Sequence, residues 1–223
     1  MPAGCAILAA GSSTRAGTDK VGADLGGQPV LAWSLAAALA SGSFSRIVVV
    51  TRADRVGAVE AIVRPRAPDA RVIAGGVTRT ASTWAALEAL GDADVIVIHD
   101  SARPFVPPSL FTRCVELARR DGSAVAGLPL ADTVRRADEA GAAVEELARE
   151  GLWSAQTPQA FRIGALREAH QRALAQGRTF TDDAALVEWT GGAIRTVPGE
   201  RRNIKITTPE DLELARAIAR AHV

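Results

Sequence analysis

Residues 5–17 read Cys-Ala-Ile-Leu-Ala-Ala-Gly-Ser-Ser-Thr-Arg-Ala-Gly, an apolar run that passes directly into a loop of small residues. Four more short apolar runs follow, at residues 47–50, 72–74, 95–98 and 124–128. All five are continuous rather than alternating, which is typical of strands covered on both faces. Helix-like segments lie near residues 29–40, 54–64, 79–90 and 108–120. This alternation predicts an α/β fold with a mostly parallel sheet and helices on both faces.

The bulk composition is that of an ordinary globular protein. The chain has 223 residues, of which 48% are hydrophobic and 23% charged, with a net charge of +1. A single domain is therefore expected, and a general nucleic-acid binder is not. No apolar run has the length of a membrane span, and no basic leader precedes the first run. Cys5 and Cys114 are too few for a disulfide framework, so we expect a cytoplasmic protein.

The strand-helix alternation breaks after Leu128. The next thirty or so residues contain Pro129, Gly141 and Pro158 and show only weak periodicity. They predict an arm at about 130–158 that protrudes from one domain comprising residues 1–223. Further helices are expected at about 162–176, from 181–183 onward, and after Thr208-Pro209-Glu210-Asp211. The last string combines an N-cap hydroxyl, a proline in the first turn and acids at the positive end of the helix dipole.

Only two of the 26 lysine and arginine residues are lysines, Lys20 and Lys205. An ammonium is a compact point charge on a flexible stem, whereas a guanidinium is a rigid planar fork. In a chain so rich in arginine, a lysine is expected where arginine cannot replace it. The alternative is that two surface lysines have survived by chance.

The loop after the first apolar run combines small residues with cations. Its backbone N–H groups can surround a phosphate, although its spacing is neither a dinucleotide fingerprint nor a Walker A loop. A tight turn after a strand is the alternative interpretation. Arg15 and Lys20, on either side of Gly17, favour polyphosphate binding.

Two later loops are also candidates for ligand binding. Gly75-Gly76 permits close backbone approach and is followed by Ser82, but it could equally form a structural turn with a hydroxyl cap. Asp100 ends a buried run, where a carboxylate is well placed to hold Mg²⁺ together with substrate phosphates. Arg103 could bind a second phosphate, and the alternative for Asp100 is a cap of the following turn.

The remaining polar residues are expected to be structural. His99 is interpreted as a packed residue at a strand end, and His170 and His222 as residues on helix surfaces. Asp182 and Asp183 are interpreted mainly as acids that match the dipole of a helix start.

Seven motifs occur in order along nearly the whole chain: AAGSSTR with Lys20, GGVTRTAS, VIVIHDSARPFV, LPLADTV, GLWSAQTPQAF, TDDAALVE and NIKITTPEDL. Together they resemble the 2-C-methyl-D-erythritol 4-phosphate cytidylyltransferases of the non-mevalonate isoprenoid pathway. The resemblance implies a Rossmann-like nucleotidyltransferase fold and transfer of CMP from CTP to methylerythritol phosphate, with release of pyrophosphate. It also implies Mg²⁺ or another divalent cation, and a homodimer in which the arm of one subunit reaches the other's active site.

The resemblance further implies roles for individual residues. The expected catalytic residues are Arg15, Lys20, Arg149 and Lys205. The expected nucleotide-binding residues are Ala9, Ala10, Gly11, Gly76, Ser82, Asp100 and Ser101, with Asp100 also near the metal. The acceptor is expected to bind Arg103, Thr133, Arg149, Thr157, Thr181 and Lys205, with Thr133 and Arg149 supplied by the partner subunit.

Four residues depart from the family pattern: Asp19 replaces a proline, Val77 a polar or acidic residue, Ser101 an alanine and Arg202 an aspartate. They affect the loop conformation and fine nucleotide contacts, but none removes a charge that the reaction needs.

Three alternatives remain open at this point. The chain could act on another polyol phosphate such as ribitol 5-phosphate, or could be a sugar-phosphate nucleotidyltransferase that uses another nucleotide. It could also be a nucleotide-binding module without activity. Retention of Arg15, Lys20, Asp100 and Lys205 together argues against the last, because binding alone would not require them all.

Overall fold

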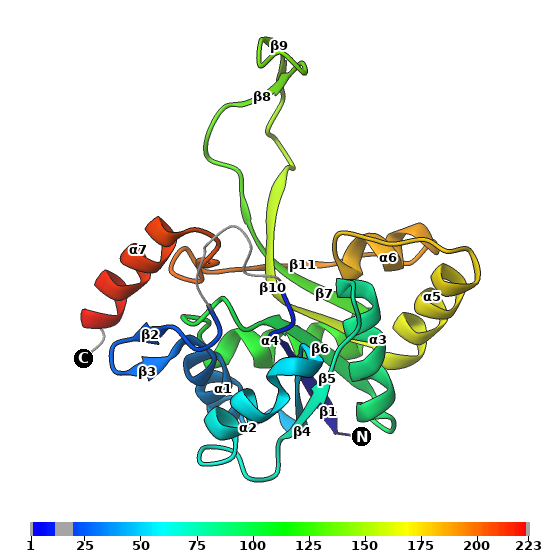
Figure 1. The fold of residues 1–223 in the computed structure, drawn as a ribbon. Coiled ribbons are helices and arrows are strands. Elements are labelled where there is room, and N and C mark those ends of the chain that lie inside the picture. The colour runs from blue at the N-terminus through cyan, green and yellow to red at the C-terminus, as the bar shows by residue number, and fades with distance from the viewer. Residues whose placement is uncertain (1, 12–19, 222–223) are drawn as a thin grey trace.

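A seven-stranded sheet forms the centre of the molecule in the computed structural model, which describes residues 2–11 and 20–221 (Figure 1). Its strand order is β11-β7-β10-β6-β1-β4-β5. The strands are β1 (Ala3–Leu8), β4 (Phe44–Thr51), β5 (Arg71–Ala74), β6 (Val95–Asp100), β7 (Ser123–Pro129), β10 (Trp153–Arg162) and β11 (Thr196–Pro198). All neighbours pair in parallel except β10, which is antiparallel to β6 and β7. The predicted α/β class with a mostly parallel sheet is confirmed.

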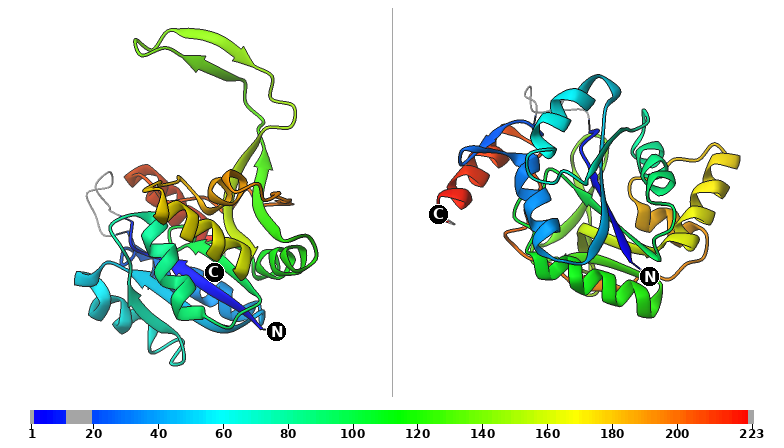
Figure 2. Two further views of the ribbon diagram at one scale, coloured as in Figure 1. Left: turned by 90° about the vertical axis from the view of Figure 1, so that its right-hand side faces the viewer. Right: turned by 90° about the horizontal axis from the view of Figure 1, so that it is seen from below.

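Helices cover both faces of this sheet (Figure 2). One face carries α1 (Val30–Ala40), α2 (Val56–Val63) and α4 (Pro108–Asp121), and the other α3 (Arg79–Leu90), α5 (Ile163–Ala175) and α6 (Asp183–Trp189). In β6, Val95 and Val97 pack into the first layer, while Ile96 and Ile98 pack into the second. Because both faces of the sheet are covered, residues 95–98 contain no polar position, which explains their continuous apolar pattern.

A smaller cluster lies beside the sheet. There α7 (Pro209–Arg220) packs against the hairpin of β2 (Asp24–Leu25) and β3 (Gln28–Pro29). The predicted cap of α7 is confirmed: Thr208 accepts a hydrogen bond from Asp211 N, and Asp211 accepts one from Thr208 N. A short 3-10 turn, η2 (Ala53–Arg55), follows β4. Among the described residues, no helix is long and apolar enough to cross a membrane.

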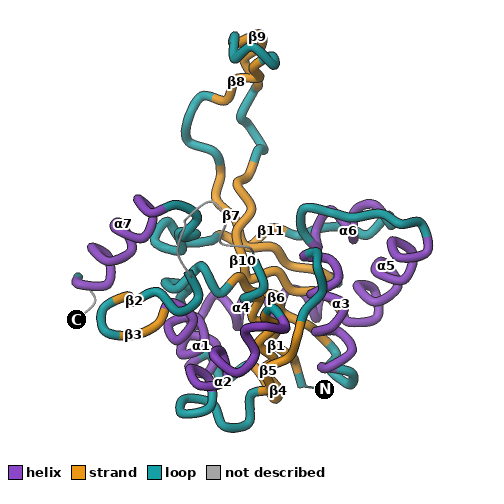
Figure 3. Tube along the Cα trace, viewed as in Figure 1, coloured by secondary structure: helices purple, strands orange, loops and turns teal. Residues whose placement is uncertain are grey.

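A long arm protrudes from the body between β7 and β10 (Figures 1 and 2). Two strands, β8 (Val134–Ala137) and β9 (Ala143–Leu147), pair near its tip, and much of the rest is loop (Figure 3). Exposed ion pairs join the strands, with Arg135 2.8 Å from Glu146 and Arg136 3.2 Å from Glu145. The protruding arm predicted from the broken periodicity is therefore present.

The expected end of the arm at residue 158 is wrong, because residues 153–158 belong to strand β10 of the central sheet. Three polar side chains of this strand are buried: Gln156, Thr157 and Gln159. Each forms a hydrogen bond with a partner distant in sequence, such as Asn203 for Gln156 and His99 for Thr157. A strand with buried polar residues has no readable apolar pattern, and the partners that permit it cannot be seen in one sequence.

Candidate active site

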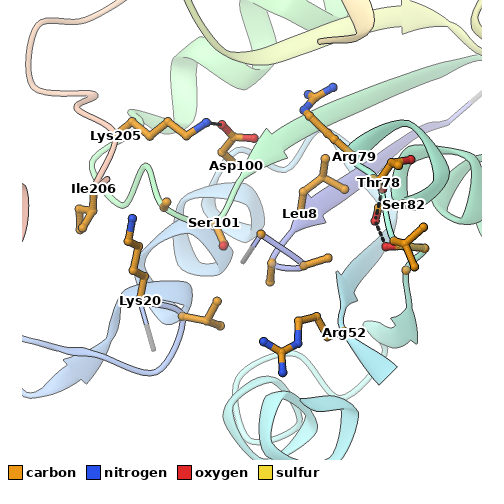
Figure 4. Close-up of a pocket in the computed structure, with 18 of the residues that line it drawn as sticks. Leu8, Lys20, Arg52, Thr78, Arg79, Ser82, Asp100, Ser101, Lys205 and Ile206 are labelled. Atoms are coloured by element: carbon orange, nitrogen blue, oxygen red, sulfur yellow. Dashed lines mark hydrogen bonds and ion pairs between the residues drawn. The ribbon is translucent and has the colours of Figure 1, made fainter. Parts of the chain in front are cut away.

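A pocket of about 770 Å³ opens at the carboxyl ends of β1, β4 and β6 (Figure 4). Strand β1 lies between β4 and β6, so the strand order changes direction there, which is where ligands bind in open α/β sheets. The volume suits a nucleotide-sized ligand. Six segments and Ser82 line it: residues 8–11, 20–21, 52–53, 75–79, 100–102 and 205–207.

The end of β1 is fixed by the strands on either side. Ala9 N donates to Val50 O at 2.7 Å, and Ser101 N donates to Leu8 O at 3.0 Å. The predicted phosphate loop therefore starts from a rigid edge, with Ala10 and Gly11 lining the pocket. Arg15 lies outside the described residues, so its predicted role stays a prediction.

The Gly75-Gly76 turn packs against the start of α3 with no room for side chains. A Cβ atom at Gly75 would lie 2.6 Å from Ser82 Oγ, and one at Gly76 would lie 2.3 Å from Ala81 Cβ. The Ser82 hydroxyl donates to Thr78 O at 3.0 Å, or to Gly76 O at 3.3 Å. The cap of α3 is Thr78, whose side chain accepts from Ala81 N at 3.0 Å. The turn thus places bare backbone on the pocket wall.

Lys20 lies at the opposite wall, close to the start of α7. Its Nζ donates to the backbone oxygen of Thr207. Thr207 N in turn donates to Asp211 at 2.7 Å, within the cap of α7. The ammonium group is therefore held at one point of the pocket by a capped helix start.

Lys205 pairs with Asp100 across the pocket, at 2.7 Å between Nζ and Oδ2. The side chain of Lys205 is 46% exposed and that of Asp100 only 14%. Burial alone would raise the pKa of Asp100, but the charge and hydrogen bond of Lys205, with the charge of Arg79, hold it below its usual value. Asp100 is therefore ionised at neutral pH, and Lys205 is its direct counterion.

His99 is a packed residue at the strand end, as predicted. It is fully buried, with Nδ1 3.0 Å from Thr157 Oγ1 and Nε2 3.2 Å from Arg103 O. Burial lowers its pKa to about 4, so the ring is neutral at physiological pH. Thr157 Oγ1 also accepts from Asp100 N at 3.0 Å. Together these contacts fix the backbone that carries Asp100.

The expected site residues that the structure describes fall into two groups. Those that line the pocket are Ala9, Ala10, Gly11, Lys20, Gly76, Ser82, Asp100, Ser101 and Lys205. The others are not part of its lining: Arg103, Thr133, Arg149, Thr157 and Thr181. Arg103 Nη1 donates to Asn203 O at 2.7 Å. Thr133 and Arg149 are exposed in the arm, where Arg149 donates to Ala131 O.

The departures from the family pattern are spread over the molecule. Val77 lines the pocket with its side chain fully exposed. Ser101 lines the pocket and is buried, and its backbone oxygen accepts from Ser34 Oγ at 3.0 Å. Arg202 is exposed and does not line the pocket, and Asp19 lies outside the described residues.

Sequence reasoning missed two arginines that line the pocket, Arg52 and Arg79. Arg52 is exposed and bonded to Asp54, with Nε 2.9 Å from Oδ1. Arg79 forms an ion pair with the buried Asp183. Arg79 stands inside the GGVTRTAS motif, but its partner is too far along the chain to be inferred. The expectation that His170 lies on a helix surface is wrong: it is fully buried beside Asp183, and His222 lies outside the described residues.

Comparisons with known proteins agree with this geometry. The family model of 2-C-methyl-D-erythritol 4-phosphate cytidylyltransferase matches residues 5–221. The chain is 41% identical, over 95% of its length, to the 2-C-methyl-D-erythritol 4-phosphate cytidylyltransferase of Synechococcus sp., of which it covers 96%. It is 43% identical, over 98% of its length, to a bifunctional enzyme IspD/IspF of Anaeromyxobacter sp., of which it spans only 58%.

Two solved structures share the fold over nearly their full lengths. The 4-diphosphocytidyl-2C-methyl-D-erythritol synthase of Anaerococcus prevotii superposes with a TM-score of 0.88 at 28% identity, covering 98% of both chains. The 2-C-methyl-D-erythritol 4-phosphate cytidylyltransferase of Thermus thermophilus gives a TM-score of 0.82 at 36% identity, covering 99% of this chain and 100% of that one. These matches extend the likeness from seven short motifs to the whole fold.

Proposed function

The chain belongs to the 2-C-methyl-D-erythritol 4-phosphate cytidylyltransferase family, and from this membership we propose how its pocket residues divide the work. It is a cytidylyltransferase of isoprenoid synthesis, which transfers CMP from CTP to 2-C-methyl-D-erythritol 4-phosphate and releases pyrophosphate. The observation that carries the division is the pocket itself, whose lining includes both Lys20 and Lys205.

The reaction needs charge neutralisation more than proton transfer. An oxygen of the acceptor phosphate forms a bond to the α-phosphorus of CTP, and the bond from that phosphorus to the bridging oxygen of pyrophosphate breaks. A phosphate monoester has its second pKa at about 6, so the nucleophile is largely ionised at neutral pH. No general base is required, and the protein must instead hold two polyanions in line.

The nucleotide side is formed by backbone and by Lys20. Residues 9–11 cradle the triphosphate, and the Gly75-Gly76 turn with Ser82 and Ser101 holds cytosine and ribose. Lys20 stabilises the charge that develops on the leaving pyrophosphate, together with Arg15. A donor fixed before reaction is effective because it need not reorganise in the transition state.

The acceptor side is formed around Lys205. An incoming phosphate competes with Asp100 for the Lys205 ammonium, and Thr181 contributes a hydroxyl. Arg103 and Thr157 support the strand end behind them. Thr133 and Arg149 lie in the arm, which protrudes away from the body of its own chain, and this favours their delivery to the site of a second subunit in a homodimer (Figure 1).

A divalent cation fits this pocket as an ion shared with the nucleotide. The described residues contain no group of three or more His, Cys, Asp or Glu side chains that could bind a metal alone. Asp100 offers one ionised carboxylate, and Mg²⁺ in nucleotide sites typically takes one or two carboxylates plus phosphate oxygens. Asp100 would hold the ion, which supplies neutralisation of the triphosphate charge when bound.

Replacing Gly76 by alanine is expected to weaken CTP binding about 10-fold or more, because overpacking of this kind costs roughly 1–3 kcal/mol. The new Cβ would meet Ala81 Cβ at 2.3 Å and push the turn away from α3. Calorimetric titration with a non-reacting CTP analogue measures the effect. The matched control is Gly57→Ala in α2, where nothing lies within 4 Å of an added Cβ. A dissociation constant equal to that of the control variant would contradict the close backbone approach.

The acceptor is tested by measuring pyrophosphate release with CTP and Mg²⁺ over a panel of polyol phosphates. We expect kcat/KM for 2-C-methyl-D-erythritol 4-phosphate to exceed that for every other acceptor by about 10-fold or more, because hydrogen-bonding sites reject ligands that leave buried groups unpaired. Equal values with ribitol 5-phosphate would favour the sister activity. No release with any acceptor would favour a nucleotide-binding module without activity.

A further inference from the structure

An ion pair behind the pocket joins two helices that are far apart in the sequence. Arg79 is the first residue of α3 and Asp183 the first residue of α6. Arg79 Nη1 donates to Asp183 Oδ2, and the two side chains are 27% and 2% exposed. Figure 4 places Arg79 on the pocket wall on the other side of Asp100 from Lys205. The pair therefore reaches from the pocket into the core.

Asp183 depends on Arg79 for its counterion. Its other close neighbour is the buried His170, whose Nε2 lies 3.5 Å from Asp183 Oδ1 and makes no hydrogen bond among the described residues. Burial would lower the pKa of Arg79, but the charges of Asp183 and Asp100 outweigh it and raise that pKa. Arg79 therefore stays charged, and its loss would leave a buried carboxylate without compensation, which is strongly destabilising.

The turn that carries Thr181 is joined to the body by hydrogen bonds as well as by the Arg79–Asp183 ion pair. Phe180 N lies 3.5 Å from Thr80 Oγ1 on α3, and Gln159 Nε2 on β10 donates to Asp182 Oδ2 at 3.0 Å. The other oxygen of Asp182 accepts from Ala185 N at 2.8 Å as the cap of α6. Thr181 itself is exposed. The turn around it is thus fixed to α3 and to β10 from both sides.

The glycine turn on the nucleotide side does not depend on Arg79. Thr78 caps α3, and the Ser82 hydroxyl reaches the carbonyls of Thr78 and Gly76 within that turn. None of these bonds involves the Arg79 side chain, so we expect them to persist when it is replaced. Loss of Arg79 should therefore displace the turn of residues 180–183, which must move to hydrate Asp183, more than the glycine turn.

We propose that Arg79 is a positioning residue for the acceptor, which fixes Thr181 relative to the nucleotide through its ion pair with Asp183. This inference rests on the proposed function, in which Thr181 contacts the acceptor phosphate. Arg79 is itself part of the pocket wall, and it acts on the acceptor through Asp183 and the start of α6.

The test compares Arg79→Gln, Asp183→Asn and the double variant, by titration of each ligand and by steady-state kinetics. We expect Arg79→Gln to weaken binding of methylerythritol phosphate, measured with a non-reacting CTP analogue present, about 10-fold or more, because a buried carboxylate loses its partner. CTP binding should change less than about 3-fold, since the glycine turn keeps its own bonds. The double variant should recover at least half of the loss on a logarithmic scale, because two neutral amides can pair where the lone carboxylate cannot.

The control is Arg119→Gln, which removes an ion pair with Asp94 at 2.9 Å that lies outside the pocket lining. Thermal unfolding of every variant reports the purely structural cost. Equal weakening of both ligands by Arg79→Gln, or unchanged acceptor binding, would overturn the inference, as would a double variant no better than Arg79→Gln. Acceptor binding and turnover of the unmodified chain test the proposed function. The role of Arg79 is tested separately, by the ratio of the acceptor dissociation constant of the variant to that of the unmodified chain.

Discussion

Replacing Lys20 by alanine is expected to lower turnover at least about 100-fold, equivalent to about 2.7 kcal/mol of transition-state stabilisation. The Lys20 ammonium lies in the pocket and is held by the Thr207 backbone oxygen at the capped start of α7. A donor fixed in this way stabilises the leaving pyrophosphate without reorganisation. Lys20→Arg should also be poor, because a planar fork cannot occupy the position of a compact ammonium.

Steady-state pyrophosphate release at saturating CTP and methylerythritol phosphate measures both variants. Arg113→Ala serves as control, since it removes an exposed cation that pairs with Glu200 at 3.7 Å away from the pocket lining. Its turnover should stay near that of the unmodified chain. Turnover of both Lys20 variants within a few-fold of the unmodified chain would refute the role of Lys20.

Replacing Lys205 by alanine is expected to lower kcat/KM for methylerythritol phosphate about 100-fold, the usual effect of losing one preorganised charge donor. Lys205 lies 2.7 Å from Asp100 and is the cation that an incoming phosphate can draw away from that carboxylate. The nucleotide contacts at residues 9–11 and at the glycine turn remain intact. The dissociation constant of a non-reacting CTP analogue should therefore change much less than kcat/KM for methylerythritol phosphate.

Asp100→Asn separates the two partners of this ion pair. Removing Lys205 also removes the charge that holds the pKa of Asp100 below its usual value, so the effect of Lys205→Ala could arise through Asp100. If Lys205 acts on the acceptor, Asp100→Asn should weaken Mg²⁺-dependent nucleotide binding and leave acceptor binding stronger than in Lys205→Ala. Identical profiles for the two variants would assign the effect to Asp100.

The sheet and most helices could be predicted because their signal is local. Strands covered on both faces carry continuous apolar runs, and α1 begins and ends within one residue of the predicted segment 29–40. The first and fourth runs also located the pocket, since parallel strands end at one edge. Lys20 and Asp100 were found for this reason, from the positions of loops rather than from contacts.

The missed features are those stabilised by partners distant in sequence. Strand β10 buries Gln156 and Gln159, which bond to Asn203 and Asp182, so its sequence lacks an apolar pattern. The same holds for Arg79, whose partner Asp183 was interpreted only as a helix-start acid. Such pairs become visible when the fold brings the segments together. Composition did connect two residues that are distant in sequence: lysine is scarce in this chain, and both of its lysines line the same pocket.

The central claim is that Lys20 serves the CTP side and Lys205 the acceptor side of one reaction. It is tested most directly by measuring kcat/KM for CTP and for methylerythritol phosphate in Lys20→Ala and Lys205→Ala, with dissociation constants for a non-reacting CTP analogue. The account predicts that Lys20→Ala loses turnover with either substrate varied and weakens the CTP analogue. Lys205→Ala should lose acceptor efficiency while binding the analogue almost normally. Equally weakened binding of the CTP analogue in both variants would contradict this division of roles.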